Sequence, residues 1–145
     1  MISKEQWKGI QNTLSYLHYM VKFRLVSGEE ITVNKSFVAE NKTALIVWID
    51  GKPSPVWGWP EHEDYRAVTE LVWRKRTFKP GASAIRRISK TKQGQKLLKR
   101  KEFAYLHEVK EFRVCDFSTA ASLVRQFRKI EGLELVTPEA ELKDE

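Results

Sequence analysis

The side chains in this sequence that could take part in catalysis are a few acids, three histidines and one cysteine. Glu108 and Lys110 form a Glu-x-Lys triplet at the start of a predicted strand, with Asp64 or Asp50 as a possible upstream acid. In a metal-dependent nuclease such residues hold a divalent cation beside the scissile phosphate. Because such triplets arise by chance in a chain with 31% charged residues, a nuclease is the weakest of three functional alternatives.

Other signals of catalysis are absent from the sequence. His18, His62 and His107 do not have the spacing of metal ligands, and there is no glycine-rich phosphate loop or nucleophile elbow. The acids of residues 61–64 suit the start of a helix, where the helix dipole favours negative charge. Cys115 has no partner for an internal disulfide and is typical of a small buried strand residue. We therefore expect a non-catalytic protein without a cofactor or metal.

The strongest feature of the sequence is a local excess of positive charge. Residues 74–101 carry twelve Lys or Arg and no acid, whereas residues 1–73 carry eight against nine and residues 102–145 carry six against ten. The formal net charge of +7 therefore comes from one segment. Its twelve basic residues are Arg74, Lys75, Arg76, Lys79, Arg86, Arg87, Lys90, Lys92, Lys96, Lys99, Arg100 and Lys101.

This segment points to nucleic acid, either DNA or RNA, as the partner. Duplex DNA presents one negative charge per about 1.7 Å of its axis, and clustered cations without counter-charges match such a polyanion. Apolar residues such as Ile85, Ile88 and Leu98 are interspersed and could hold the segment to a core. We predict that the twelve cations contact backbone phosphates, in an accessory or regulatory protein of the kind found in viruses and mobile elements.

The main alternative is a protein partner. The same cations could dock on an acidic surface of a nucleic-acid-processing enzyme, which would make the chain an inhibitor or adaptor. Trp57 and Trp59 are candidates for stacking on bases or for anchoring a partner. A DNA-reading helix-turn-helix is not supported, because Lys90 occupies the position where that motif needs a small residue before Gly94.

The elements of the first half are predicted from local patterns. Ser3 and Gln6 fit a capping box that begins a helix over residues 4–17. Apolar and polar residues then alternate over residues 20–33, which predicts a hairpin with one apolar face. A central strand over residues 44–49 follows, and Val56 and Trp57 are predicted to form an edge strand.

The second half shows weaker patterns. Residues 61–75 are predicted to form a helix, with a strand over 67–78 as the alternative, and two short helices with basic faces follow Pro80-Gly81. The remaining elements are a strand over 111–117, a helix capped by Ser118 and a strand over 133–136.

Together these elements predict a single α+β domain over residues 1–136. We expect a curled antiparallel sheet, with a small-barrel-like form as a variant, flanked by helices and by the basic helical segment 74–101. Residues 137–145 are predicted to be a disordered acidic tail. The longest apolar run, Ala44–Ile49, is far shorter than the about 20 residues that a membrane span needs, so we expect no membrane partner and a cytoplasmic, intracellular location.

Overall fold

The computed structural model describes residues 1–143. Its contacts divide the chain into two compact units. We call Met1–Arg74 together with Arg113–Glu145 the sheet unit, and Lys75–Phe112 the basic unit. The basic unit is thus an insertion in the sequence of the sheet unit. The predicted α+β class is confirmed, since helices accompany an antiparallel sheet.

The sheet unit is built on five antiparallel strands in the order β6-β3-β2-β1-β7. Their bounds are Met20–Arg24 (β1), Glu30–Ala39 (β2), Lys42–Ile49 (β3), Asp116–Phe117 (β6) and Glu134–Leu135 (β7). The two edge strands contain two residues each and do not pair with one another. The sheet is therefore open and does not close into a barrel.

The register of the central strands explains the alternating sequence pattern. In β1 and β2, Val21 lies opposite Val33 and Phe23 lies opposite Ile31, and all four side chains are buried. Their sequence neighbours point to the other face, because successive side chains of a strand alternate between faces. The predicted hairpin with one apolar face is confirmed.

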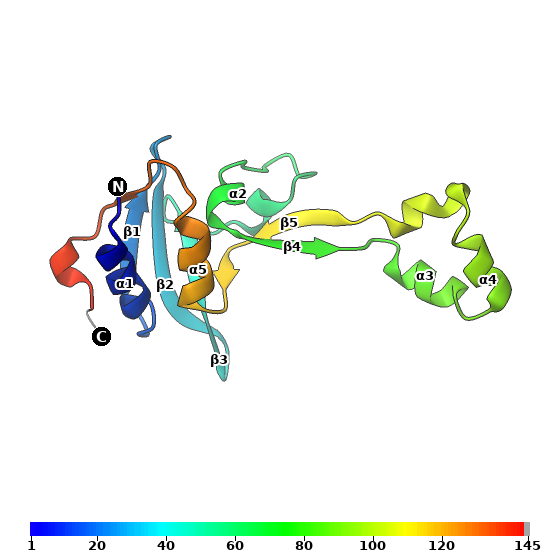
Figure 1. Ribbon diagram of the computed structural model, residues 1–145, viewed down its shortest axis with the longest axis horizontal. Helices are drawn as coiled ribbons and strands as arrows, with labels where there is room; N and C mark the ends of the chain where they lie inside the picture. The colour runs from blue at the N-terminus through cyan, green and yellow to red at the C-terminus, as the bar shows by residue number, and fades with distance from the viewer. Residues whose placement is uncertain (144–145) are drawn as a thin grey trace. The chain divides into compact units, whose positions relative to one another are not determined.

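Two helices cover the apolar face of the sheet. Helix α1 (Lys4–Thr13) and helix α5 (Ala120–Phe127) lie side by side over it (Figure 1). Trp7 of α1 stacks on Phe23 with ring centroids 6.0 Å apart, and Phe127 of α5 meets Phe23 edge-on at 5.4 Å. These aromatic contacts join both helices to the sheet and form the centre of the core.

The predicted capping box at the first helix is confirmed, but the helix is shorter than expected. The Ser3 amide donates to Gln6 Oε1 at 2.8 Å, and the Gln6 amide donates to Ser3 Oγ at 3.1 Å. The helix ends at Thr13 rather than at residue 17. His18 adopts the left-handed region with φ of 66°, so the chain turns there before it enters β1.

The predicted helix over residues 61–75 is wrong. The chain forms a short helix α2 (Thr69–Val72) and then a strand β4 (Arg74–Phe78), close to the strand alternative. Trp73 is fully buried and extended, and its indole N–H donates to the Val47 carbonyl at 3.1 Å. A helix continued through residue 75 would lose this contact, so tertiary packing overrides the favourable charges at the predicted helix ends.

The predicted edge strand at Val56 and Trp57 is also wrong. Pro55–Gly58 form a 3-10 turn, η1. A side chain at Gly58 would meet the Arg113 carbonyl oxygen, since an added Cβ would lie 2.0 Å from it. This close backbone approach requires glycine and holds the turn against the chain at Arg113.

The predicted strand over residues 111–117 is divided between two sheets. Strand β5 (Lys110–Val114) pairs with β4 in a separate two-stranded sheet, whereas β6 pairs with β3. Cys115 lies between them and is half-buried, and its carbonyl accepts from the Val47 amide at 2.8 Å. Burial, followed by the neighbouring Asp116 carboxylate, raises the pKa of the Cys115 thiol.

The acidic end of the chain, for which disorder over residues 137–145 is predicted, contacts the sheet unit in the part that the structure describes. Thr137 Oγ1 accepts from the Lys22 amide at 2.7 Å, and a short 3-10 turn, η3 (Glu139–Glu141), follows. Leu142 packs against the hydrophobic core, and the Lys143 amide donates to Thr13 Oγ1 at 2.7 Å. One apolar side chain and these hydrogen bonds therefore hold the segment to the sheet unit. The last two residues of the predicted tail lie outside the described residues.

The helices of the basic unit are short. They are α3 (Ala82–Ile88), α4 (Lys92–Leu97) and the 3-10 helix η2 (Lys101–His107). None of the helices formed by residues 1–143 combines the length and apolar character that a membrane crossing would need.

Candidate nucleic-acid interface

The basic unit is held together by close backbone contact between α3 and α4. An added Cβ at Gly94 would lie 1.8 Å from the Ile88 carbonyl oxygen, so only glycine allows α4 to pass so near the end of α3. Thr91 Oγ1 caps α4 by accepting from the Gly94 amide at 3.0 Å. The Gln95 side chain donates to the Ser89 carbonyl at 2.9 Å and fixes the turn between the helices.

The third helix of the unit is joined to the first two in a similar way. An added Cβ at Gly81 would lie 2.3 Å from the Leu106 carbonyl oxygen, which brings η2 against the start of α3. Leu98 and Leu106 are 8% and 9% exposed and are the buried large apolar side chains of the unit. With so little apolar burial, the unit depends on its glycine contacts and helix caps.

The structure displays the predicted phosphate-binding residues on the surface. Eleven of the twelve are exposed, and Arg74 is half-buried. The first members of the segment lie in the strand β4 rather than in a helix, whereas those from Arg86 to Lys96 lie on α3, on α4 or between them. The basic helical segment therefore begins after β4.

Two of the twelve cations are paired with carboxylates. Arg74 belongs to the sheet unit, lies 3.5 Å from the Asp116 carboxylate and also donates to the Asp116 carbonyl at 2.9 Å. Lys75 lies 2.9 Å from the Glu111 carboxylate. Within residues 1–143 the other ten form no ion pair: Arg76, Lys79, Arg86, Arg87, Lys90, Lys92, Lys96, Lys99, Arg100 and Lys101.

Three consecutive cations line one pocket of the basic unit. Lys99, Arg100 and Lys101 border a hollow of about 690 Å³ between α4 and η2. Its remaining lining residues are Gln95, Leu98, Ala104 and His107, so no carboxylate lines it. The ring Nε2 of His107 is hydrogen-bonded to the Leu98 carbonyl at 3.0 Å, which holds the end of α4 against η2.

Comparison of the chain with protein-family models, with curated proteins and with solved structures yielded no match.

Gln95, Ala104 and His107 are pocket residues that sequence reasoning missed. Lys101, Ala104 and His107 recur every three residues, and this spacing forms a single row only in a 3-10 helix. In an α-helix, where a turn takes about 3.6 residues, the same three side chains would spread around the axis. The sequence carries no clear signal for a 3-10 helix here, so the row could not be recognised.

The two tryptophans predicted to contact bases or a partner differ in exposure. Trp57 packs against the core, its ring stacks on Trp73 with centroids 6.4 Å apart, and the Arg66 guanidinium lies 4.7 Å from its centroid. Trp59 is 38% exposed. Internal packing thus engages Trp57, and Trp59 offers the larger accessible ring.

The acids considered for a nuclease are not gathered with other potential ligands. Among residues 1–143, no group of three His, Cys, Asp or Glu side chains is placed to hold a metal ion. Asp50 instead accepts from the Glu30 amide at 2.9 Å and lies 3.7 Å from Arg66. Asp64 donates from its amide to the His62 ring at 3.0 Å. Both acids have structural contacts in the turns that contain them.

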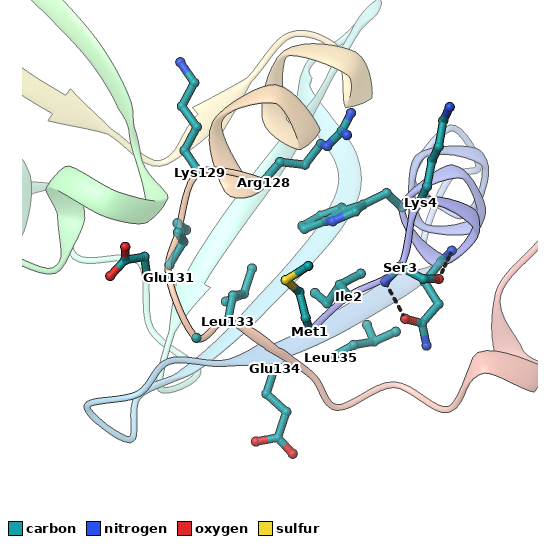
Figure 2. Close-up of a pocket in the computed structure, with 14 residues that line it drawn as sticks. Met1, Ile2, Ser3, Lys4, Arg128, Lys129, Glu131, Leu133, Glu134 and Leu135 are labelled. Carbon is teal, nitrogen blue, oxygen red and sulfur yellow. Dashed lines mark hydrogen bonds between the residues drawn. The ribbon is translucent and has the colours of Figure 1, made fainter.

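A second hollow, of about 930 Å³, lies in the sheet unit between the start of α1 and the residues that follow α5. In Figure 2, Met1, Ile2 and Leu133 meet near its centre, while Glu131 and Glu134 point away from it. None of the predicted site residues lines this hollow. It is therefore separate from the candidate interface.

Proposed function

We propose that the chain binds nucleic acid through the basic unit, that its exposed cations contact backbone phosphates, and that the protein itself does no chemistry. The observation that supports this proposal is the set of ten exposed cations without a carboxylate partner among the described residues. Arg74 and Lys75 are left out of the proposed interface, because Asp116 and Glu111 already neutralise them.

The charge of the basic unit gives the physical reason. Residues 75–112 contain twelve Lys or Arg and three Glu, which leaves nine net positive charges in one compact unit. The Debye length is about 8 Å at physiological ionic strength, so neighbouring cations in such a unit are only partly screened from one another. A polyanion relieves this repulsion and gains entropy by releasing its counterions.

The types of the cations also suit phosphate. Arg86 and Arg87 are exposed in the last turn of α3. A guanidinium presents several N–H donors in a planar fork and can bind two phosphate oxygens at once. Lysines such as Lys92 and Lys96, four residues apart on one side of α4, add point charges that tolerate different backbone positions.

Fluorescence anisotropy tests the proposal with single-stranded and double-stranded DNA and RNA at two salt concentrations. Replacing Arg86, Arg87, Lys99 and Arg100 by Glu should abolish binding. The matched control replaces four exposed cations of the sheet unit by Glu, namely Lys8, Arg24, Lys42 and Arg125. It makes the same change in net charge and should retain most of the affinity. Absence of binding to all four forms at low salt would refute the proposal.

An acidic surface of another protein is the second candidate partner. The same unpaired cations would meet its carboxylates, and the exposed Trp59 could supply an apolar anchor. The anisotropy experiment separates the two, because a protein-only adaptor would bind none of the nucleic acids. In that case a Trp59→Ala variant should weaken capture of the acidic partner.

A further inference from the structure

The pocket between α4 and η2 is formed by two rows of side chains. Gln95, Leu98 and Lys99 are three and four residues apart and share one side of α4 and its end. Lys101, Ala104 and His107 recur every three residues, and in a 3-10 helix such side chains lie above one another. Arg100 joins the two rows. Leu98 is the one buried lining residue, and the hydrogen bond from His107 to its carbonyl joins the two rows, while the other six side chains are exposed.

The two halves of the lining differ in chemistry. Ala104, which is exposed, and the small accessible part of Leu98, which is 8% exposed, supply the apolar part of the lining. Lys99, Arg100 and Lys101 supply three positive charges, with no carboxylate among the lining residues. A phosphate by itself would be attracted by the charges but would gain nothing from the apolar surface. A ligand that fits both halves has a flat, weakly polar body and an adjacent phosphate.

We infer that this pocket binds one unpaired nucleotide, with its base against Leu98 and Ala104 and its phosphates near Lys99, Arg100 and Lys101. This inference rests on the proposed function and specifies the nucleic-acid ligand as a single strand, or an unpaired end or bulge. In a duplex the faces of the bases are stacked on one another, so a base reaches such a pocket only when it is unstacked. The volume of about 690 Å³ is within the range of small-molecule pockets, about 300–1,000 Å³.

The exposed tyrosine of the same helix is a poorer base site. Tyr105 is 66% exposed, but it lies in a different row of η2. Glu102 and Glu108 are three residues before and after it, and their carboxylates would repel the phosphates that accompany a bound base. In the row of η2 that lines the pocket, the position three residues before Ala104 is occupied by Lys101 and not by an acid.

The experiment is a thermodynamic cycle with the full-length chain. Ala104→Leu places a larger apolar side chain in the pocket without changing the charge, so that a base can no longer enter. Ala104→Ser is the matched control that leaves the pocket open. Ala104 is exposed, so neither change should affect folding. Each protein is titrated with a short single strand, with the same strand lacking the bases at its central positions, and with a blunt duplex.

For the native protein we expect on the order of tenfold tighter binding to the intact strand than to the abasic strand, because the abasic strand lacks the apolar area that a base would bury in the pocket. Ala104→Leu should lose this factor on the intact strand and leave both abasic and duplex binding unchanged, whereas Ala104→Ser should retain it. Equal binding of the native protein to intact and abasic strands would refute the inference that the pocket binds a base, while leaving the proposed phosphate binding intact. Loss of the factor in Tyr105→Ala, with Ala104→Leu unaffected, would also overturn it. Absence of binding to every probe would refute the proposed function itself.

Discussion

The contact between α3 and α4 can be tested by the substitution Gly94→Ala. The added Cβ would lie 1.8 Å from the Ile88 carbonyl oxygen and 2.9 Å from its carbonyl carbon. Both atoms belong to the backbone, so the overlap is relieved only if the two helices move apart. Alanine gains about 1 kcal/mol over glycine in a helix interior, whereas overpacking typically costs about 1–3 kcal/mol and a backbone overlap costs more. We expect a net loss of stability that is confined to the basic unit.

The positions of the tryptophans make this prediction measurable. All five tryptophans, at positions 7, 48, 57, 59 and 73, belong to the sheet unit, so their fluorescence reports on that unit alone. In Gly94→Ala the urea midpoint of the tryptophan signal should not change, while amide hydrogen exchange over residues 82–107 should become faster. Nucleic-acid affinity should fall in parallel. Gln93→Ala is the matched control, because it adds no atom near α3. Unchanged exchange in Gly94→Ala would refute the argument that the glycine contact holds the unit together.

Three further outcomes follow from the contacts described above. If about six phosphates of duplex DNA are neutralised, the log–log salt slope of duplex binding should be about −5. Arg86→Gln with Arg87→Gln should make this slope about 1.8 less steep, since each duplex phosphate contributes about 0.9; a slope unaffected by both changes would place the phosphates elsewhere. The raised pKa of Cys115 means that, as pH rises, its thiol ionises in the unfolded chain before it ionises in the native protein. Alkylation at mildly alkaline pH should therefore be slower in the native than in the urea-unfolded protein, and equal rates would contradict this. The free energy of unfolding should fall as pH rises through the ordinary thiol range. Leu142→Ala should destabilise the sheet unit by about 1–2 kcal/mol in urea unfolding, less than a fully buried leucine because Leu142 is half-buried; an unchanged midpoint would show that the Leu142 side chain adds nothing to stability.

The elements that the sequence predicts well have strong local signals. The capping box of Ser3 and Gln6 needs only neighbouring residues, and it begins α1 where expected. The alternating residues of β1 and β2 work similarly, because a one-residue shift in register would turn the whole apolar set towards solvent. The helix after residue 118 is confirmed as well, although Thr119 rather than Ser118 is its cap.

The segment between residues 55 and 78 shows where local signals fail. Glu61, Glu63 and Asp64 lie near the start of a predicted helix, yet helix α2 begins only at Thr69. The burial of Trp73 and the close approach of Gly58 to Arg113 are long-range contacts, separated in sequence from the residues that they touch. Their free energy outweighs the few tenths of a kcal/mol to about 1 kcal/mol that charges at helix ends provide.

The sequence predicts which cations belong to the candidate site, but not their ion pairs or the pocket that three of them border. The sequence identifies the cations, and the structure adds that ten of them lack carboxylate partners and that three border a pocket. Neither point can be derived from the sequence, because ion pairing depends on which acids come near. Glu111 pairs with Lys75, whereas Glu102, although adjacent to Lys101, forms no ion pair with it. Sequence proximity therefore does not predict neutralisation.

The separation of the cationic helices into their own unit follows from the cost of burying charge. Charged groups lose hydration free energy when they are buried, and paired acids are needed to offset that loss. Residues 75–112 offer three acids for twelve cations, so most of the cations must stay in water. Only a few side chains, chiefly Leu98 and Leu106, remain to form a core, and glycine contacts replace the missing apolar area. The fold of such a unit depends on close approach of its helices. A bound polyanion would stabilise the unit further, because it would reduce the repulsion among the cations.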